Sequence, residues 1–182
     1  MSDFKINPLS KRKLESTLRM LHRVYPIVSD DESFDKALPS SLDPKKYRHV
    51  FEEMGVDQGR YWVASKKTRV AGIVGLYSYE KDKDALWVGW FGVSPRYRGQ
   101  EIGKRLLDYV IKKAEKGDKR YLRLWTSTDP NEQLAHVMYE KRGFVKTDEG
   151  PLEGSQFKKL IYELDLDKIR KPKTRKAGTY EK

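Results

Sequence analysis

The chain has 182 residues, no cysteine, three histidines and a formal net charge of +11. This length suits one domain with its own core, and the lack of cysteine excludes disulfides, thiolate nucleophiles and cysteine-rich zinc sites. The histidines, His22, His49 and His136, lie too far apart in the sequence to indicate a local metal motif, so we expect no metal site.

No stretch has the pattern of a targeting or membrane-spanning segment. The N-terminal residues contain no apolar run of signal-peptide length, and the longest hydrophobic run, residues 70–77, is too short to cross a bilayer. We therefore expect a soluble cytoplasmic protein with no membrane partner. The positive charge favours a polyanionic partner or an anionic cofactor, although a basic surface can also serve solubility alone.

The first half of the sequence predicts helices separated by an acidic loop. A short strand over residues 3–7 precedes a helix that Ser10 can cap and that runs to Val24, before Pro26. Residues 29–35, SDDESFD, read as a solvated loop or as the lip of a site. A second helix is predicted from Asp43 to Gly55, because aspartate followed by proline suits a first helical turn.

The second half begins with three consecutive strands. Residues 60–66 and 69–79 form a predicted hairpin, and residues 81–84 turn the chain into a third strand over 85–93. This third strand is apolar on both faces, as expected for a central strand. Gly89 and Gly92 interrupt it, which indicates a bulge or the close approach of a ligand or of another backbone.

A helix–strand–helix–strand series completes the chain. We predict a helix from Ile102 to Lys116, a strand over 121–126, a helix from Asn131 to Arg142 closed by Gly143, and a last strand over 156–164. The element order predicts an α/β (α+β) fold, with a mixed sheet and helices on both of its faces.

The turn that precedes the helix at Ile102 has the composition of an anion site. In RYRGQEIGKRLL, residues 96–107, a glycine-containing turn leads from a strand into a helix, so that backbone N–H groups and the positive end of the helix dipole converge. The glycine spacing does not fit GxGxxG. It does not fit a Walker loop either, because only three residues separate Gly99 from Gly103 and Arg105 follows Lys104.

The sequence resembles the GNAT superfamily of N-acetyltransferases. PRYRGQEIGKRLL resembles that superfamily's signature for binding the pyrophosphate of acetyl-CoA, and AHVMYEKRGF, residues 135–144, resembles its second conserved block. GWFGVSP and LRLWT support the match, which covers about residues 4–166. The resemblance implies one domain over residues 1–166, with a twisted, mostly antiparallel sheet.

The resemblance also assigns residues to acetyl-CoA. Phe91, Gly92 and Val93 would lie beside the pantetheine arm, and Asn131 would be a further cofactor residue. The pyrophosphate cradle would consist of Arg98, Gly99, Gln100, Glu101, Ile102, Gly103 and Lys104. Glu101 departs from the family, which usually has glycine there. We expect its side chain to point into solvent and the loop to remain functional; the alternative is a loop that has lost its cofactor.

The chemistry requires a neutral amine, a polarised thioester carbonyl and a proton for the departing thiolate. By resemblance Tyr139 is the general acid, and a phenol of pKa about 10 can protonate a thiolate of pKa about 8.5; alternatively, Tyr139 is a core aromatic residue. Glu132, seven residues earlier and on the same helical face, is one candidate base. Glu80, Asp129, His136 and a chain of water molecules are the others.

The resemblance implies an acetyl-CoA-dependent N-acetyltransferase that acts on a primary amine by direct transfer, as a monomer or a homodimer. The alternative is a non-catalytic module that binds CoA or nucleic acid. The acidic segment 29–35 favours a cationic amine, such as a polyamine or a lysine or N-terminal amine of a protein, unless it only solvates a loop. Residues 167–182 read as a flexible basic tail that could contact nucleic acid weakly.

Overall fold

The computed structural model describes residues 4–26 and 33–170 of the chain. In this part, seven strands form one sheet in the order β1-β2-β3-β4-β5-β7-β6. The strands are β1 (Lys5–Pro8), β2 (Val56–Lys66), β3 (Arg69–Tyr79), β4 (Asp82–Val93), β5 (Tyr121–Ser127), β6 (Val145–Pro151) and β7 (Lys158–Asp165). The helices are α1 (Lys11–Val24), α2 (Phe34–Leu42), α3 (Arg48–Glu53), α4 (Ile102–Ala114), α5 (Gln133–Glu140) and α6 (Leu166–Ile169), with 3-10 turns η2 (Pro95–Tyr97) and η3 (Pro130–Glu132).

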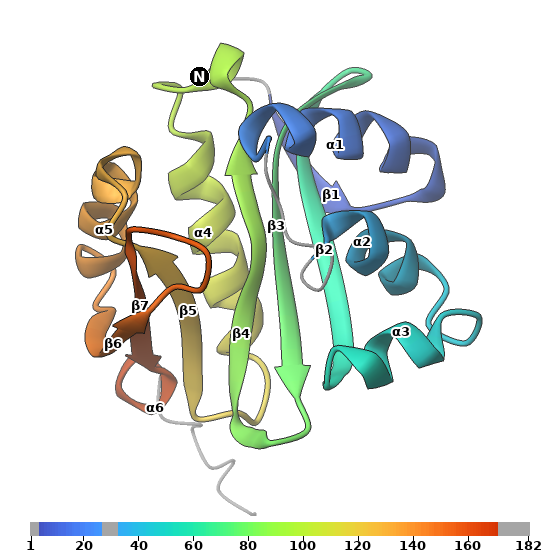
Figure 1. The fold of residues 1–182 in the computed structure, drawn as a ribbon. Coiled ribbons are helices and arrows are strands. Elements are labelled where there is room, and N and C mark those ends of the chain that lie inside the picture. The colour runs from blue at the N-terminus through green and yellow to red at the C-terminus, as the bar shows by residue number, and fades with distance from the viewer. Residues whose placement is uncertain (1–3, 27–32, 171–182) are drawn as a thin grey trace, which may run out of the picture.

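The sheet is antiparallel except where β4 meets β5. These two strands run parallel and pair over only three positions, Ala85 to Trp87 against Tyr121 to Arg123. Beyond these pairs the two ribbons separate toward the ends of both strands, so that the sheet opens between β4 and β5 (Figure 1). The mixed, mostly antiparallel sheet predicted from the sequence is thereby confirmed.

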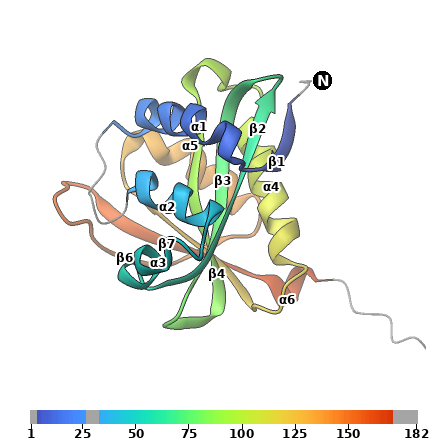
Figure 2. The ribbon, with the colours of Figure 1, turned by 90° about the vertical axis from the view of Figure 1, so that its right-hand side faces the viewer.

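Alternating side chains on the strands build a hydrophobic core on each face of the sheet. On β2, Tyr61 and Val63 pack with α1 and α2, whereas Trp62 and Ala64 pack with α4 on the opposite face. Figure 2 shows α1 and α2 on one side of the sheet and α4 on the other. The prediction of helices on both faces is therefore also confirmed.

Helix α5 is held beside α4 by an ion pair. The Arg142 guanidinium, just after α5, donates to both carboxylate oxygens of Asp108 on α4, at 2.5 and 3.1 Å. Arg142 also donates to the carbonyl of Met138, at 3.1 Å. Arg142, which belongs to the sequence block at residues 135–144, thus links α4 and α5, the helices beside the opening of the sheet.

Two predictions in the first half of the chain are wrong. Residues 34–42 form helix α2, in which the Ser33 hydroxyl caps the N–H of Asp35, although the sequence was read as a loop up to residue 35. The helix predicted over 43–55 is present only as α3, because Asp43 ends α2 and its carboxylate accepts from the N–H of Lys46 in the intervening turn. Pro39 lies inside α2, which obscures the helical pattern.

The sequence analysis also missed β6. Val145 to Pro151 pair with β7 as an edge strand, and six of the seven residues are exposed. An exposed edge strand needs no alternation of apolar residues, and Asp, Glu, Gly and Pro are all depleted in strands generally.

The C-terminal basic segment begins on the domain itself. Leu166 is fully buried, and Arg170 donates to the carbonyls of Glu115 and Gly117, each at 3.1 Å, and to that of Lys119. Arg170 therefore holds the end of α6 against the loop that follows α4. The remainder of the predicted tail, residues 171–182, and most of the acidic segment, residues 29–32, lie outside the described residues.

Candidate active site

A β-bulge in β4 lies beside the opening of the sheet. Between the pairs Ile73–Gly92 and Gly75–Gly89, β3 advances by two residues and β4 by three, so β4 carries one extra residue. Trp90 and Phe91 occupy this segment and pack toward opposite faces. The Tyr25 hydroxyl donates to the Phe91 carbonyl at 2.6 Å, which ties the end of α1 to the bulge. The interruption predicted from the two glycines of this strand is thus a real irregularity.

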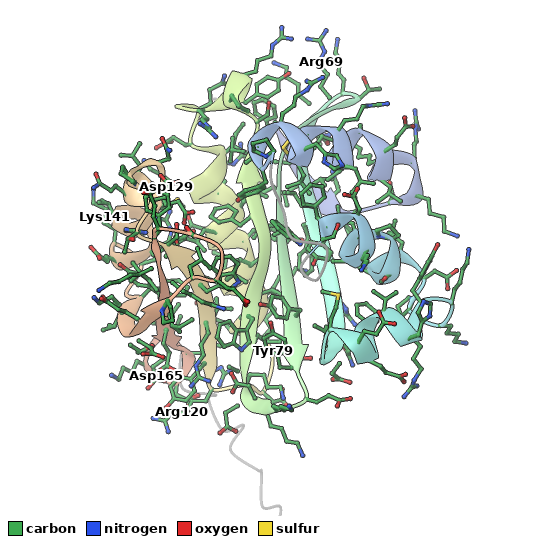
Figure 3. The ribbon with its side chains drawn as sticks, in the orientation of Figure 1. Arg69, Tyr79, Arg120, Asp129, Lys141 and Asp165 are labelled. Carbon is green, nitrogen blue, oxygen red and sulfur yellow. The ribbon has the colours of Figure 1, made fainter. Side chains whose placement is uncertain are left out.

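A cavity of about 170 Å³ extends from the opening of the sheet across the face that carries α1 to α3. Half of its sixteen lining residues are aromatic: Tyr25, Tyr61, Tyr77, Tyr79, Trp90, Phe91, Trp125 and Tyr139. The others include Thr126 and Glu132 near Tyr139 at the open end, and Met54, Val56 and Gly59 at the other. Figure 3 shows Tyr79 near the end of β3, toward the turn into β4.

The floor of this cavity depends on two glycines. A Cβ atom on Gly75 would lie 2.3 Å from Cε1 of Tyr61, and one on Gly89 would lie 3.3 Å from the same atom. Gly75 and Gly89 are cross-strand partners on β3 and β4. The Tyr61 ring, from β2, therefore lies directly on a backbone surface that only glycine leaves flat.

The loop before α4 presents unused backbone donors. Within the described residues, no N–H group of residues 99–104 donates to another backbone group, and the first helical bond of α4 runs from the N–H of Arg105 to the carbonyl of Glu101, at 3.0 Å. Gly99 has φ of +77° and Glu101 has φ of +60°. The N–H groups of the loop thus have no backbone acceptor in the described residues and lie at the positive end of a thirteen-residue helix, an arrangement that suits an anion.

Glu101 occupies a position whose backbone favours glycine. Its left-handed conformation explains physically why a glycine is suited to this position. The side chain is 68% exposed, and its carboxylate forms an ion pair with Lys104 Nζ at 2.8 Å. The hydrogen bond from Lys104 and its charge lower the pKa of the Glu101 carboxyl. Lys104 is therefore engaged by Glu101 in this structure.

The structure brings several predicted cofactor residues together at the start of α4. A Cβ on Gly103 would lie 3.6 Å from Val93, 3.8 Å from Met138 and 3.9 Å from the Phe91 ring. Burial and then the charge of Glu132 raise the pKa of the Tyr25 phenol, and the charge of Arg98 partly offsets this rise; Tyr25 also lines the cavity. The loop and the open end of the cavity are consequently neighbours.

Two other residues predicted for the cofactor lie differently. Gly92 faces α1, since a Cβ there would be 3.3 Å from both Tyr25 and Val24. Asn131 is exposed, and its side chain donates to the Asp129 carboxylate at 2.9 Å. Neither lines the cavity, and Figure 3 shows Asp129 at the start of the α5 segment.

Tyr139 lies at the open end of the cavity and is only 7% exposed. Burial, followed by the charges of Tyr25 and Glu132, raises the pKa of its phenol above the ordinary value, so the hydroxyl keeps its proton. Its ring lies 6.4 Å from that of Phe91 and 6.0 Å from that of Tyr162. The ring of Tyr139 thus belongs to the core, and the residue also lines the cavity; its role as general acid stays a prediction.

Glu132 lies near Tyr139 in the same cavity, but in η3 and not in the helix predicted to carry both. Its Oε2 accepts from the Thr126 hydroxyl and, at 3.0 Å, from the N–H of Ser127, while Oε1 accepts from the Ser127 hydroxyl at 3.0 Å. A carboxylate has about four lone-pair sites, so one site on Oε1 remains for a ligand or water. The carboxylate thus holds the end of β5 and still reaches the cavity.

The remaining candidate bases occupy other positions. His136 Nε2 lies 3.3 Å from the Thr126 hydroxyl, behind Glu132. Asp129 accepts from the N–H of Asn131 at 2.8 Å, and Glu80 is exposed after β3; neither lines the cavity. Asp35, the last residue of the acidic segment, pairs with His22 at 3.1 Å. Among the described residues, no group of three His, Asp or Glu side chains could hold a metal ion.

Sequence reasoning missed four residues that shape this site: Tyr25, Tyr61, Thr126 and Ser127. Tyr25 and Tyr61 come from elements remote in the sequence from the second half, where the motifs lie. The signal for Tyr61 was present in part, because glycines in two neighbouring strands indicate a close approach without naming what approaches. Thr126 and Ser127 end a predicted strand, and only the structure shows that they contact Glu132.

A comparison with protein-family models identifies the family to which this chain belongs. The model described as "Acetyltransferase (GNAT) family" matches residues 21–144, more than half of the chain. The chain belongs to the GNAT acetyltransferase family. The resemblance inferred from the two sequence blocks is thereby confirmed.

Solved structures share the GNAT fold at low sequence identity. The ribosomal-protein-S18-alanine N-acetyltransferase of Escherichia coli is 17% identical, with a TM-score of 0.68 over 90% of this chain and 94% of that one. NAA60 of Arabidopsis thaliana, solved with a bisubstrate analogue, is 16% identical, with a TM-score of 0.63 over 89% and 97% of the two chains. A spermidine N-acetyltransferase chimera that includes the Vibrio cholerae sequence is 14% identical, with a TM-score of 0.67 over 92% and 98%.

A search of curated proteins gave no significant match. In the parts of this GNAT chain that the structure describes, no helix combines the length and the apolar composition needed to cross a membrane.

Proposed function

We propose that this protein is an N-acetyltransferase that transfers the acetyl group of acetyl-CoA directly to a primary amine. The observation that carries the proposal is a juxtaposition. The unused N–H groups of residues 99–104 lie next to the opening between β4 and β5, and Tyr139 lies at the cavity end of the same opening. An anion site and a neutral buried phenol are thus arranged around one opening.

The residues present fit acetyl-CoA. The N–H groups of residues 99–104, with Arg98, would hold its pyrophosphate, and Phe91 and Val93 would lie along its pantetheine arm. Gly103 places the start of α4 against Val93 and Phe91, since a Cβ at Gly103 would be in van der Waals contact with both. In this proposal Gly92 shapes the bulge from the α1 side, and Asn131 supports the turn before α5.

Residues of this chain would transfer the two protons of the reaction. Acetyl-CoA supplies an activated acetyl group; a nitrogen–carbon bond replaces the carbon–sulfur bond, one proton leaves the nitrogen and one reaches the sulfur. Tyr139 would donate the proton for the sulfur. Burial raises the pKa of this phenol, so Tyr139 would hold its proton until a thiolate forms beside it.

Glu132 is the residue best placed to receive the proton of the amine. Its free lone-pair site on Oε1 lies in the same cavity as Tyr139, whereas the other oxygen accepts from Thr126 and Ser127. These bonds fix the direction of the carboxylate, which general base catalysis requires. Water bound at Oε1 would carry the proton to solvent.

The acceptor class follows from the family. The structural neighbours are named for a protein alanine amine and for spermidine, so both small amines and protein amines are acceptors within this fold. The cavity beside Tyr139 is the space on this chain in which such an amine would lie.

Calorimetric titration with acetyl-CoA, followed by thiol release over a panel of amines, tests the proposal. We expect binding and amine-dependent release, with Tyr139→Phe lowering kcat at least tenfold and leaving the Kd of acetyl-CoA unchanged. Tyr109→Phe, on the face of α4 that packs on Trp62, is the matched control. Absence of acetyl-CoA binding would contradict the proposal and favour a non-catalytic module, which the pairing of Lys104 with Glu101 would then explain.

A further inference from the structure

The side chains that line the cavity indicate which kind of acceptor it can hold, a point that the reaction alone does not decide. Away from Tyr139, the cavity is lined by the rings of Tyr61, Tyr77, Tyr79 and Trp90, with Trp125 on the β5 side. Gly75 and Gly89 let the Tyr61 ring lie on the sheet, where it forms a flat aromatic floor. Such walls offer extensive apolar contact to a group placed between them.

Charge is scarce in this cavity. Glu132 is the one charged residue among its lining residues in the described part of the chain, and three donors already hold its carboxylate. Asp35 pairs with His22 and does not line the cavity. A second ammonium group entering the cavity would therefore lose its hydration without gaining a counter-charge.

Two carboxylates, those of Asp57 and Glu80, lie near the far end of the cavity without lining it. The pKa of Arg48 is raised by its hydrogen bond to Glu52 and, to a smaller extent, by Glu80 and Asp57. Asp57 lies 3.4 Å from the Ser78 hydroxyl, which donates to it. The charge of Arg48 therefore offsets part of the charge of these carboxylates.

We infer that the acceptor is a primary amine that carries a large apolar or aromatic group close to its nitrogen. This inference rests on the proposed function. The amine lies near Tyr139 and Glu132, and the apolar group lies over the Tyr61 ring, between Tyr79 and Trp90. The same chemistry occurs in free arylalkylamines and in the N-terminal amine of a peptide that begins with a large apolar residue.

A panel of acceptors tests the inference. Phenethylamine is compared with spermidine, and short peptides beginning with Phe are compared with peptides beginning with Gly or Lys, each at saturating acetyl-CoA. We expect kcat/KM for the apolar member of each series to be at least tenfold higher, because burying one large apolar group contributes that much. The two series separate a free amine from a peptide as the source.

A matched pair of variants tests the location. Tyr79→Ser removes a ring from the cavity, whereas Tyr121→Ser removes one from the far end of β5, where Arg120 stacks on it. Tyr79→Ser should raise KM for phenethylamine at least fivefold, and Tyr121→Ser should leave it unchanged. Calorimetric titration of the protein with phenethylamine alone should show the same difference without turnover.

The possible failures are distinguishable. If the protein binds no acetyl-CoA and acetylates no amine in the panel, the proposed function is wrong and this inference falls with it. If the protein acetylates spermidine or the Lys peptide better than the apolar acceptors, or if Tyr79→Ser has no effect on the KM of phenethylamine, the proposed function stands and the apolar acceptor is wrong.

Discussion

Gly75→Ala tests the flat floor of the cavity directly. The new Cβ would lie 2.3 Å from Cε1 and 2.5 Å from Cδ1 of Tyr61, whereas carbon atoms in contact normally stand about 3.5–4.0 Å apart. The Tyr61 ring must therefore move by more than ~1 Å. Overpacking of this kind costs about 1–3 kcal/mol, which corresponds to a fall in Tm of roughly 2–12 °C for a chain of this size.

A double-mutant cycle isolates the contact. In a Tyr61→Ala background the obstacle is absent, so Gly75→Ala should cost close to nothing, and the coupling free energy should be about 1–3 kcal/mol. Gly150→Ala on β6, where nothing lies within 4 Å of the added Cβ, is the control and should be neutral. Thermal unfolding followed by circular dichroism gives all the values. An equal cost of Gly75→Ala in both backgrounds would refute the reasoning.

Three further predictions concern the loop, the helix tie and an acidic group. Glu101→Gly relieves the left-handed backbone and releases Lys104, so the Kd of acetyl-CoA in calorimetry should stay equal or fall; a large loss of affinity would mean that Glu101 supports the loop. Arg142→Gln breaks the ion pair with Asp108 and should lower the unfolding free energy, measured by urea titration, by about 1–2 kcal/mol. Adding Asp108→Asn should lower the unfolding free energy little further, because the pair is already broken. Hydrogen bonds from Lys158 and Lys146 lower the pKa of the Glu149 carboxyl from 4.5 to about 2. The difference in Tm between the wild type and Glu149→Gln should therefore be complete above pH 4.5 and disappear as the pH falls to about 2. A difference in Tm that does not change with pH would contradict this prediction.

Local patterns in the sequence were sufficient for much of the fold. The apolar spacing of α1 and α4 and the turn at residues 67–68 depend on neighbours a few residues apart, and each appears as predicted to within two residues. Gly143 adopts φ of +85° after α5, as expected of a residue that closes a helix. Elements specified by short-range periodicity could therefore be predicted from the sequence.

Features that depend on tertiary context were not recoverable. Helix α2 contains Pro39, and packing of Phe34 and Leu38 against the sheet maintains it against a poor local propensity. Strand β6 is specified by its pairing with β7, since its own residues are mostly exposed. In both cases the deciding partner lies in another element, so the pattern of the segment itself does not show it.

The candidate site shows the same division. The motifs predicted the loop at 98–104 and Tyr139, because their residues are contiguous. The bonds that Glu132 makes to Thr126 and Ser127, and the position of Tyr61 on Gly75, join residues from separate elements. Glu101 stood out in the sequence as an exception, and its φ of +60° supplies the reason.

The brief contact between β4 and β5 has a consequence for the order in which the molecule folds. Strands β2 to β4, like β6 and β7, pair with near neighbours through antiparallel ladders, whereas the parallel β4–β5 pairing closes a segment of more than thirty residues for three pairs. Such non-local parallel pairing forms late. Arg123, which bridges Asp82 on β4 and Glu163 on β7 at 2.7 Å each, clamps the two halves at this point. The amides around this clamp should therefore exchange with solvent deuterium sooner than those of β2 and β3, and the opening that holds the candidate site should be the first region lost on unfolding.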